Sequence, residues 1–507
     1  MFRRLFLGAL SRATYSVINI VVMLFLTPFL IHALGTGTYG IVVLMGVFTA
    51  QGFGGLADLG FASAVTKYCA QYAAGGEEDE LDRLLGTSFW LYVFIGLGTA
   101  LLVWLFGRLA LDHLFTIAPA DRPLAGTLLI ILAAGTAVDF AALWLAAVLD
   151  GFQRYSVGNG IQIGRLALMA TLVVSGVRAG YGAVGWVTAL VAATAITGAV
   201  SYLYLKRISR WALSRARFDR TMVRTLWSFS SKVFVTRLTS VAYHTIDRVA
   251  LGTFRNTAAL AAYDVCNKIH TASVIPLGFT STLTVPTVSS LDATGRAEDV
   301  REFFLRGTLY TAGISLPIVV VLMALAPHIL AVWIGQGFEQ YATEARVFLS
   351  YVLLWSLTPV GWNTMIGLNR TGELLPVNIL SVVLNLVISV ALVGSMGVLG
   401  VILGTVIGNL VAVPLYLRSF LGALGITFKH FVGRVILRAY PQALAVGLAL
   451  WLLLRGWQPD SVIELGLAAS AAALAYVLLF WLTGVDAADK RRFSALLGRR
   501  TPPPVTP

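Results

Sequence analysis

The sequence places ionisable side chains inside two long apolar segments of its second half. The first segment contains Lys232, Arg237, His244, Asp247 and Arg248, and the second contains Asp264, Lys268 and His270. A charged residue in the middle of a membrane-spanning helix costs about 2.5 to 3.5 kcal/mol, so such residues normally face the protein interior. The lysines and arginines outnumber the aspartates, and this excess favours binding of an anion.

Spacing along the first segment predicts one polar helix face. Arg237, His244 and Arg248 follow one another at intervals of seven and four residues, which places them on the same side of a helix. Arg237 lies about 15 Å inside the segment, near the middle of a bilayer. A guanidinium binds two phosphate oxygens at once. We therefore expect Arg237 to bind a phosphate or pyrophosphate group, with Lys232 beside it or extended towards the lipid headgroups.

An ion-pair cluster is the alternative for the remaining charges. Asp264 and Lys268 are one helical turn apart, and Asp247 and Arg248 are adjacent. These four residues either pair with one another near the outer membrane face, or leave Arg248 and Lys268 available for substrate.

The first half offers fewer candidates. Arg12 and Asp58 lie near the ends of predicted helices, and Asp139 lies in the middle of one. Arg12 is a further candidate for substrate binding. Asp139 and Asp58 are candidates for ion coupling, because a buried carboxylate can bind a proton or a cation. A hydrogen bond to a neighbouring helix, or a pair with Arg165, would give Asp139 a structural role instead.

Composition shows which elements must position these residues. Of 507 residues, 58% are hydrophobic and 12% are charged, against roughly a quarter charged in soluble domains. Apolar runs long enough for about fourteen membrane-spanning helices follow one another along the chain. They begin near Ser11, Tyr39, Ser88, Leu124, Gly158, Tyr181, Ser228, Thr257, Leu305, Thr343, Leu375, Val398, Val435 and Val462. The fold class is all-α and polytopic.

The formal net charge of +13 reflects membrane topology and not nucleic-acid binding. Lysines and arginines concentrate in alternate loops, most densely between Lys206 and Arg224. Because such loops stay in the cytoplasm, both termini are expected to be cytoplasmic.

Two halves of the chain repeat. GFASAVT at 60–66 and LGT at 85–87 correspond to GFTSTLT at 278–284 and RGT at 306–308, and the separation stays between 218 and 221 residues. Six helices per repeat give both halves the same orientation, as in parallel-repeat transporters with a central binding site. We expect bundles at 1–210 and 211–425, two additional helices at 426–488 and a cytoplasmic tail at 489–507.

Enzyme motifs are absent from the sequence. It has no GxxxxGK[ST] phosphate loop and no HExxH zinc motif, and no predicted outer loop exceeds about 20 residues. We therefore expect a protein that is not an enzyme and that needs no cofactor or metal.

Several short motifs resemble the polysaccharide transporter family, the O-antigen and exopolysaccharide flippases of the multidrug, oligosaccharidyl-lipid and polysaccharide exporter superfamily. They are TPFL at 27–30, LGTGTYG at 34–40, GLADLGF at 55–61, Asp247-Arg248, Leu251-Gly252, Ala262-Tyr263, GLNR at 367–370, Asn378 and Asn385. The resemblance implies two six-helix bundles around a cationic cavity. It also implies flipping of undecaprenyl-pyrophosphate-linked oligosaccharide from the cytoplasmic to the periplasmic leaflet of a bacterial inner membrane.

Two other functions stay open at this point. One is an ion-coupled exporter of small molecules, and the other is a membrane-embedded glycan polymerase or ligase. The expected partners are the lipid-linked oligosaccharide, membrane lipid and other polysaccharide-assembly proteins, and no nucleic acid.

Overall fold

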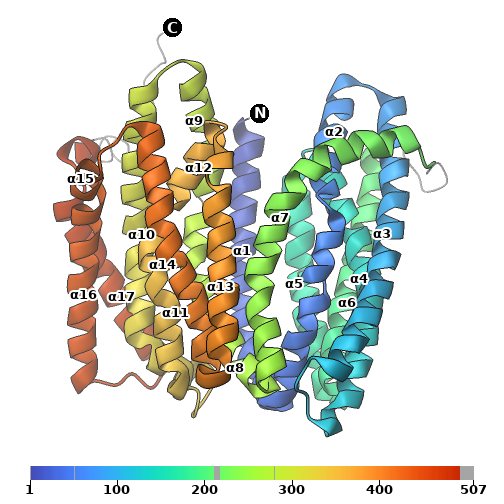
Figure 1. Ribbon diagram of the computed structural model, residues 1–507, viewed down its shortest axis with the longest axis horizontal. Helices are drawn as coiled ribbons and strands as arrows, with labels where there is room; N and C mark the ends of the chain where they lie inside the picture. Colours follow the sequence, from blue (N-terminus) through green and yellow to red (C-terminus); the bar gives the residue numbers. More distant parts are fainter. Residues whose placement is uncertain (1, 51, 210–216, 279, 492–507) are drawn as a thin grey trace. The chain divides into compact units, whose positions relative to one another are not determined.

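The computed structural model describes residues 2–50, 52–209, 217–278 and 280–491. Side chains are described outside residues 2–10, 12–13, 232–233, 235–240, 242–244 and 280–283. The described chain is helical throughout and contains no strand (Figure 1). The prediction of an all-α fold is confirmed.

The α-helices are α1 (Phe2–Met45), α2 (Phe61–Gly75), α3 (Glu78–His113), α4 (Arg122–Gly151), α5 (Tyr155–Gly176), α6 (Gly182–Ile208), α7 (Arg220–Phe254), α8 (Thr257–Gly278), α9 (Thr280–Ala293), α10 (Ala297–Trp333), α11 (Ala342–Trp355), α12 (Pro359–Gly367), α13 (Leu375–Met396), α14 (Val398–Leu424), α15 (Phe428–Phe431), α16 (Leu437–Gly456) and α17 (Val462–Leu479). Short 3₁₀ or π turns join several of them, among them η1 (Gly46–Phe48), η2 (Phe53–Asp58), η4 (Val177–Tyr181), η8 (Val432–Ile436) and η9 (Phe480–Gly484).

Nine segments of the described chain are long and apolar enough to cross a membrane. The protein is therefore a multi-pass membrane protein. The charged helices α7 and α8 are not among the nine, and the number of about fourteen spans stays a prediction. The spans expected from Ser11 and Tyr39 both begin within α1, which consists of two helices separated by a kink at Gly35, where φ is 77° and ψ is 159°.

Helix boundaries follow the sequence repeat. Helices α2 and α3 begin at residues 61 and 78, and α9 and α10 begin at 280 and 297, so both pairs have the same separation. The turns between the paired helices are also alike. Gly76 and Gly295 have φ of +70° and +69°, which favours glycine, and acidic residues then occupy the first turns of α3 and α10. Matching helix boundaries and turns thus accompany the sequence repeat.

The chain forms two compact units. Unit 1 contains residues 1–268 and 378–408, and unit 2 contains residues 269–377 and 409–507. The expected bundles at 1–210 and 211–425, with further helices at 426–488 and a tail at 489–507, stay a prediction.

The core of unit 1 lies between α2, α3 and α4. Phe140 and Trp144 of α4 are fully or almost fully buried. The Trp144 indole Nε1 donates a hydrogen bond of 2.9 Å to Ser88 of α3. Gly96 lets the two helices approach, because a Cβ atom there would lie 3.1 Å from the Phe140 Cβ. This rigid packing supports the part of α7 that lies against α2 and α3.

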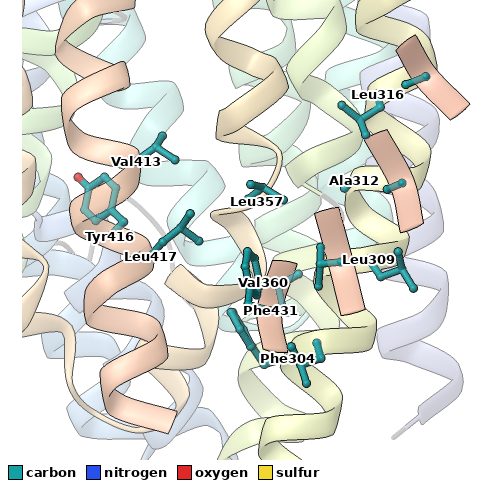
Figure 2. Packing of buried hydrophobic residues seen from close by; sticks show 14 of the residues in the cluster. Phe304, Leu309, Ala312, Leu316, Leu357, Val360, Val413, Tyr416, Leu417 and Phe431 are labelled. Atoms are coloured by element: carbon teal, nitrogen blue, oxygen red, sulfur yellow. The ribbon is translucent and has the colours of Figure 1, made fainter. Parts of the chain in front are cut away.

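The core of unit 2 gathers around α10. Figure 2 shows Phe304, Leu309, Ala312 and Leu316 facing side chains from α12, α14 and α15. The ring of Phe304 lies 5.9 Å from that of Phe431, in a stacked arrangement. The last two helices, α16 and α17, also pack on α10. These helices have no counterpart in the repeat, and they are integral to the core of unit 2.

Candidate functional site

The charged residues from Asp247 to Lys268 lie in unit 1, where α7 and α8 meet at a tight turn. Arg255, just after α7, donates hydrogen bonds from Nε and Nη2 to the carbonyls of Val393 and Gly394, at 2.9 and 2.7 Å. A cation at the end of α13 compensates the exposed carbonyls there. This contact fixes the turn against α13 and so positions Asp247 and Asp264, which are 2% and 6% exposed.

Asp264 is the centre of a charged cluster. Lys268 Nζ lies 2.5 Å from Asp264 Oδ2, and Arg248 Nη2 lies 3.6 Å from Oδ1. Tyr39 of α1 donates a hydrogen bond of 2.7 Å to Oδ2, and its hydroxyl accepts one from Lys268. The Tyr39 ring in turn stacks on Trp186 of α6, with 5.3 Å between centroids. The alternative interpretation of Arg248, Asp264 and Lys268 as an ion-pair cluster agrees with this geometry.

The cluster has more positive than negative charge. Asp264 supplies one negative charge, whereas Arg248 and Lys268 supply two positive charges. The Arg248 Nε is buried and has no hydrogen-bond partner among the described residues. A buried donor without a partner is costly and attracts an anionic or polar ligand. The buried Arg248 Nε is therefore available to a polar or anionic ligand, and Asp247 acts electrostatically on the same arginine.

Asp247 takes part in a separate polar network. Tyr263 Oη and Thr405 Oγ1 donate to Asp247 Oδ2 at 2.7 and 2.9 Å, and Asn385 Nδ2 donates to Thr405 Oγ1 at 2.8 Å. The other carboxylate oxygen, Oδ1, is buried without a hydrogen-bond partner. Carboxylate, hydroxyl and amide oxygens are the groups that bind a hard monovalent or divalent cation, and the same carboxylate can take a proton.

A glycine stripe on α14 brings Thr405 to this network. Gly400, Gly404 and Gly408 recur every four residues, a pattern that lets membrane helices approach closely. A Cβ atom at Gly404 would collide with the Ser389 hydroxyl of α13 and lie 2.8 Å from the Asn385 carbonyl. The sequence motifs included Tyr263 and Asn385, but neither of them, nor Thr405, was predicted as a site residue. The sequence signal that could have identified them is a polar residue beside a stripe of small residues.

The two aspartates predicted for ion coupling lie elsewhere in unit 1. Asp58 is fully buried, and it accepts hydrogen bonds from the Tyr92 hydroxyl and from the Ala62 backbone N–H, the latter at 3.2 Å. Asp139 is half-buried on α4, and the charge of Arg165 on α5 acts on it. Arg165 itself donates from Nε to Gln162 at 2.8 Å. Neither aspartate joins the cluster around Asp264.

The structure brings together only some of the predicted substrate-binding residues. Arg248 and Lys268 share the Asp264 carboxylate. The side chains of Arg12, Lys232, Arg237 and His244 lie outside the described residues, although their backbones belong to α1 and α7. Their roles stay predictions.

A known relative matches part of the chain. A stretch of 201 residues, 38% of this chain, is 23% identical to the probable flippase AglR of Haloferax volcanii. The match spans 42% of the length of that protein.

Two solved structures are similar to most of the chain. A multidrug resistance MATE family transporter of the MOP superfamily, in an inward-facing conformation, has a TM-score of 0.67 at 16% identity over 82% of this chain and 98% of its own. The lipid II flippase MurJ, in an inward closed conformation, has a TM-score of 0.65 at 12% identity over 96% of this chain and 100% of its own. At these identities the likeness shows the fold.

A sequence profile gives the family. The profile described as Polysaccharide biosynthesis protein matches residues 33–343, which is more than half of the chain and includes α7, α8 and the Asp264 cluster. The resemblance to polysaccharide transporters, predicted from the sequence motifs, is confirmed. This chain belongs to the polysaccharide biosynthesis protein family.

Proposed function

We propose that this protein is a flippase that moves a polyprenyl-pyrophosphate-linked oligosaccharide from the cytoplasmic to the periplasmic leaflet of a bacterial inner membrane. The family match over residues 33–343 is the observation that carries the proposal. The partial similarity to a probable flippase and the fold shared with a lipid II flippase support it.

The charges of the Asp264 cluster suit such a cargo. Moving a pyrophosphate through hydrocarbon is opposed by the loss of its hydration, and fixed cations offset that loss. Arg248 and Lys268 exceed Asp264 by one positive charge. Arg237, predicted to lie on the same face of α7, would add a further positive charge.

Transport of this kind needs no nucleotide. The membrane potential supplies about 2.3 kcal/mol per charge for each 100 mV, so a doubly charged headgroup leaving a negative interior gains about 4.6 kcal/mol. In our proposal the two sequence repeats, with bundles at 1–210 and 211–425, alternate access to a cationic cavity. The helices at 426–488 support this movement, and other polysaccharide-assembly proteins supply and use the glycan.

Asp247 is our candidate for ion coupling, beside the predicted Asp139 and Asp58. Its network joins four helices, because Asp247, Tyr263, Asn385 and Thr405 come from α7, α8, α13 and α14 respectively. A cation or proton on the buried Oδ1 would change the contacts of all four helices together. Ion binding there can therefore favour one conformation over another.

Deletion of the gene tests the proposal. A deletion strain should lose its surface polysaccharide and accumulate the lipid-linked glycan in the cytoplasmic leaflet, and the wild-type gene should restore export. Mass spectrometry of the lipid extract identifies the glycan. A strain that keeps its polysaccharide but becomes sensitive to drugs would instead indicate the small-molecule exporter.

A further inference from the structure

A cavity of about 530 Å³ lies along the first two turns of α7, apart from the Asp264 cluster. It is lined by Arg220, Thr221, Arg224, Thr225 and Ser228, all within unit 1. The two arginines are one helical turn apart and exposed. We infer that this cavity binds the phosphate group of a membrane lipid.

The arginines of the cavity have no counter-charge. Neither Arg220 nor Arg224 makes a hydrogen bond or an ion pair to any residue that the structure describes. A pair of free guanidinium groups at this spacing presents several N–H donors to one side of the helix. Phosphate oxygens are the ligands that such donors bind best, because the contacts are charged and bidentate.

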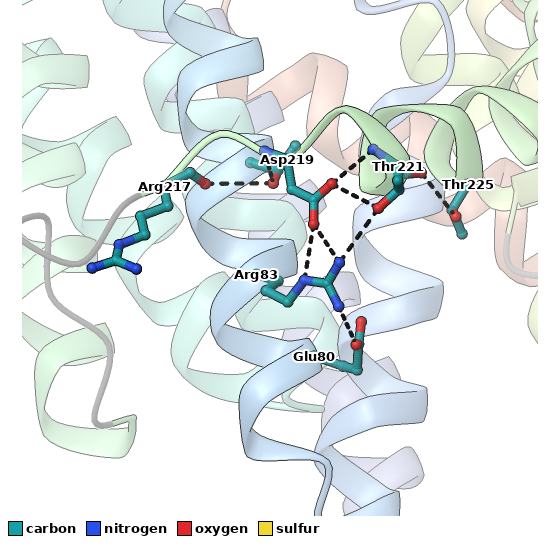
Figure 3. Close-up of polar contacts among 7 residues, drawn as sticks. Glu80, Arg83, Arg217, Asp219, Thr221 and Thr225 are labelled. Atoms are coloured by element: carbon teal, nitrogen blue, oxygen red, sulfur yellow. Dashed lines mark hydrogen bonds and ion pairs between the residues drawn. The ribbon is translucent and has the colours of Figure 1, made fainter.

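The nearest acid is already occupied, as Figure 3 shows. Asp219 Oδ2 accepts from Arg83, with the Nε contact at 2.9 Å, and Oδ1 accepts from the backbone and side chain of Thr221 at 2.7 and 2.6 Å. The hydrogen bonds from the Thr221 side chain and from Arg83 hold the pKa of Asp219 well below its usual range. Arg83 pairs with both Asp219 and Glu80, so this group has one excess negative charge, and Arg220 and Arg224 together still leave one excess positive charge beside it.

The same contacts show that the site is not the end of the helix itself. Asp219 caps α7 by accepting the Thr221 backbone N–H. The ligand would bind to the flank of the helix, where the arginine side chains project. The hydroxyls of Thr225 and Ser228 donate to backbone carbonyls of their own helix at 3.2 and 2.8 Å, so the cations contribute most of the affinity.

Exposed aromatic residues indicate that the ligand is a lipid. Phe218, which precedes the cavity residues, and Trp227, which lies between Thr225 and Ser228, are 48% and 46% exposed. Phe218 packs edge-on against Phe94, which is also exposed. Aromatic rings next to basic residues are typical of the membrane interface, where lipid phosphates lie. The predicted membrane span also begins at Ser228. The cavity is therefore placed at headgroup depth.

Lipid retention by purified protein tests the inference. The full-length protein and the variant R220Q/R224Q are placed in phosphatidylcholine nanodiscs with either phosphatidylglycerol or a polyprenyl pyrophosphate, and native mass spectrometry counts the retained lipid. The variant R296Q/R370Q is the matched control. It removes the same charge from two exposed arginines that pair with Asp299 and Glu373.

We expect R220Q/R224Q to retain about tenfold less of the added phosphatidylglycerol or polyprenyl pyrophosphate than the wild type and the control. Preference for phosphatidylglycerol or for the polyprenyl pyrophosphate would identify the source of the phosphate, and either supports the site. Equal retention by all three proteins overturns it, as does binding of inorganic pyrophosphate in solution without any retained lipid. Retention is independent of export, so this result and the test of the proposed function can fail separately.

Discussion

Replacing Asp264 by asparagine removes the only carboxylate of the cluster around α8. Lys268 would then lose its counter-charge, and Arg248 would keep only its electrostatic interaction with Asp247. The amide group is nearly the same size, so the change is electrostatic. Protein stability should fall, because the structure cannot move these two cations into water without unpacking α7 and α8.

The size of the effect follows from the geometry. At an effective dielectric constant of about 20, the attraction to Asp264 is about 7 kcal/mol for Lys268 and about 5 kcal/mol for Arg248. Desolvation cancels much of it, and breaking a buried pair costs about 3 to 5 kcal/mol in practice. The side chains of Lys268 and Arg248 are 19% and 28% exposed, so water screens the charges and the expected loss of stability lies at the lower end of this range. We expect about 3 kcal/mol, or a decrease in Tm of about 3 °C for a chain of 507 residues.

Thermal unfolding in one detergent measures the effect. Asp299→Asn is the control, because Asp299 pairs with Arg296 on the surface, where a salt bridge contributes about 0 to 1 kcal/mol. The double variant D264N/K268M should recover part of the lost stability, since it removes the cation that has lost its counter-charge. If D264N lowers Tm no more than Asp299→Asn does, the cluster does not stabilise unit 1 in the way we describe.

Further predictions concern export, coupling, packing and pH. Arg237→Ala should abolish polysaccharide export at normal protein abundance, and wild-type export would exclude Arg237 from the mechanism. Asp247→Asn should leave the protein inserted but make export independent of ion gradients in vesicles, whereas unchanged dependence would leave Asp247 a structural role. Gly404→Val should lower the free energy of unfolding by about 1 to 3 kcal/mol, because α13 has no room for the side chain; an unchanged Tm would contradict this packing. The pKa of Asp219 is lowered, first by its hydrogen bond from the Thr221 side chain. A carboxyl whose pKa is lowered in the folded state stabilises the fold at every pH above its pKa in the unfolded chain, and this stabilisation is lost only as the pH falls below about 4. Amide hydrogen exchange in the first turn of α7 should therefore show unchanged protection between about pH 5 and pH 8.

The fold was predictable because its signals are local. Apolar length predicts membrane helices, and the motifs near Gly60 and Gly278 predict the repeat that the boundaries of α2 and α9 follow. The division into two units was harder to predict from the sequence. Residues 378–408 belong with unit 1 although they lie more than 100 residues after Lys268 in the chain. Contacts of this kind depend on which helix faces meet, and no short motif encodes them.

Site residues were predictable within a helix and not between helices. The pairing of Asp264 with Lys268 follows from their spacing of one turn, and the structure has this pair. The hydroxyl of Tyr39 approaches the same carboxylate from a position 225 residues away in sequence. Thr405 likewise reaches Asp247 across 158 residues. A hydroxyl in an apolar helix has no distinctive pattern, so its partner is visible only once the helices are packed.

The carboxylates of Asp247 and Asp264 have no counterpart in the first repeat. Residues 29 and 46 of the first repeat, which correspond to Asp247 and Asp264, are Phe29 and Gly46, so the first half has no carboxylate at either place. It contributes the Tyr39 hydroxyl to the Asp264 cluster instead. When one copy of a duplicated fold carries buried charges, neutral hydrogen-bond donors from the other copy can stabilise them. A second set of buried charges would add its own desolvation cost. Tyr39→Phe should therefore weaken the cluster without changing its charge, and a Tm decrease of similar size to that of D264N would show that hydrogen bonding, and not charge, holds Asp264 in place.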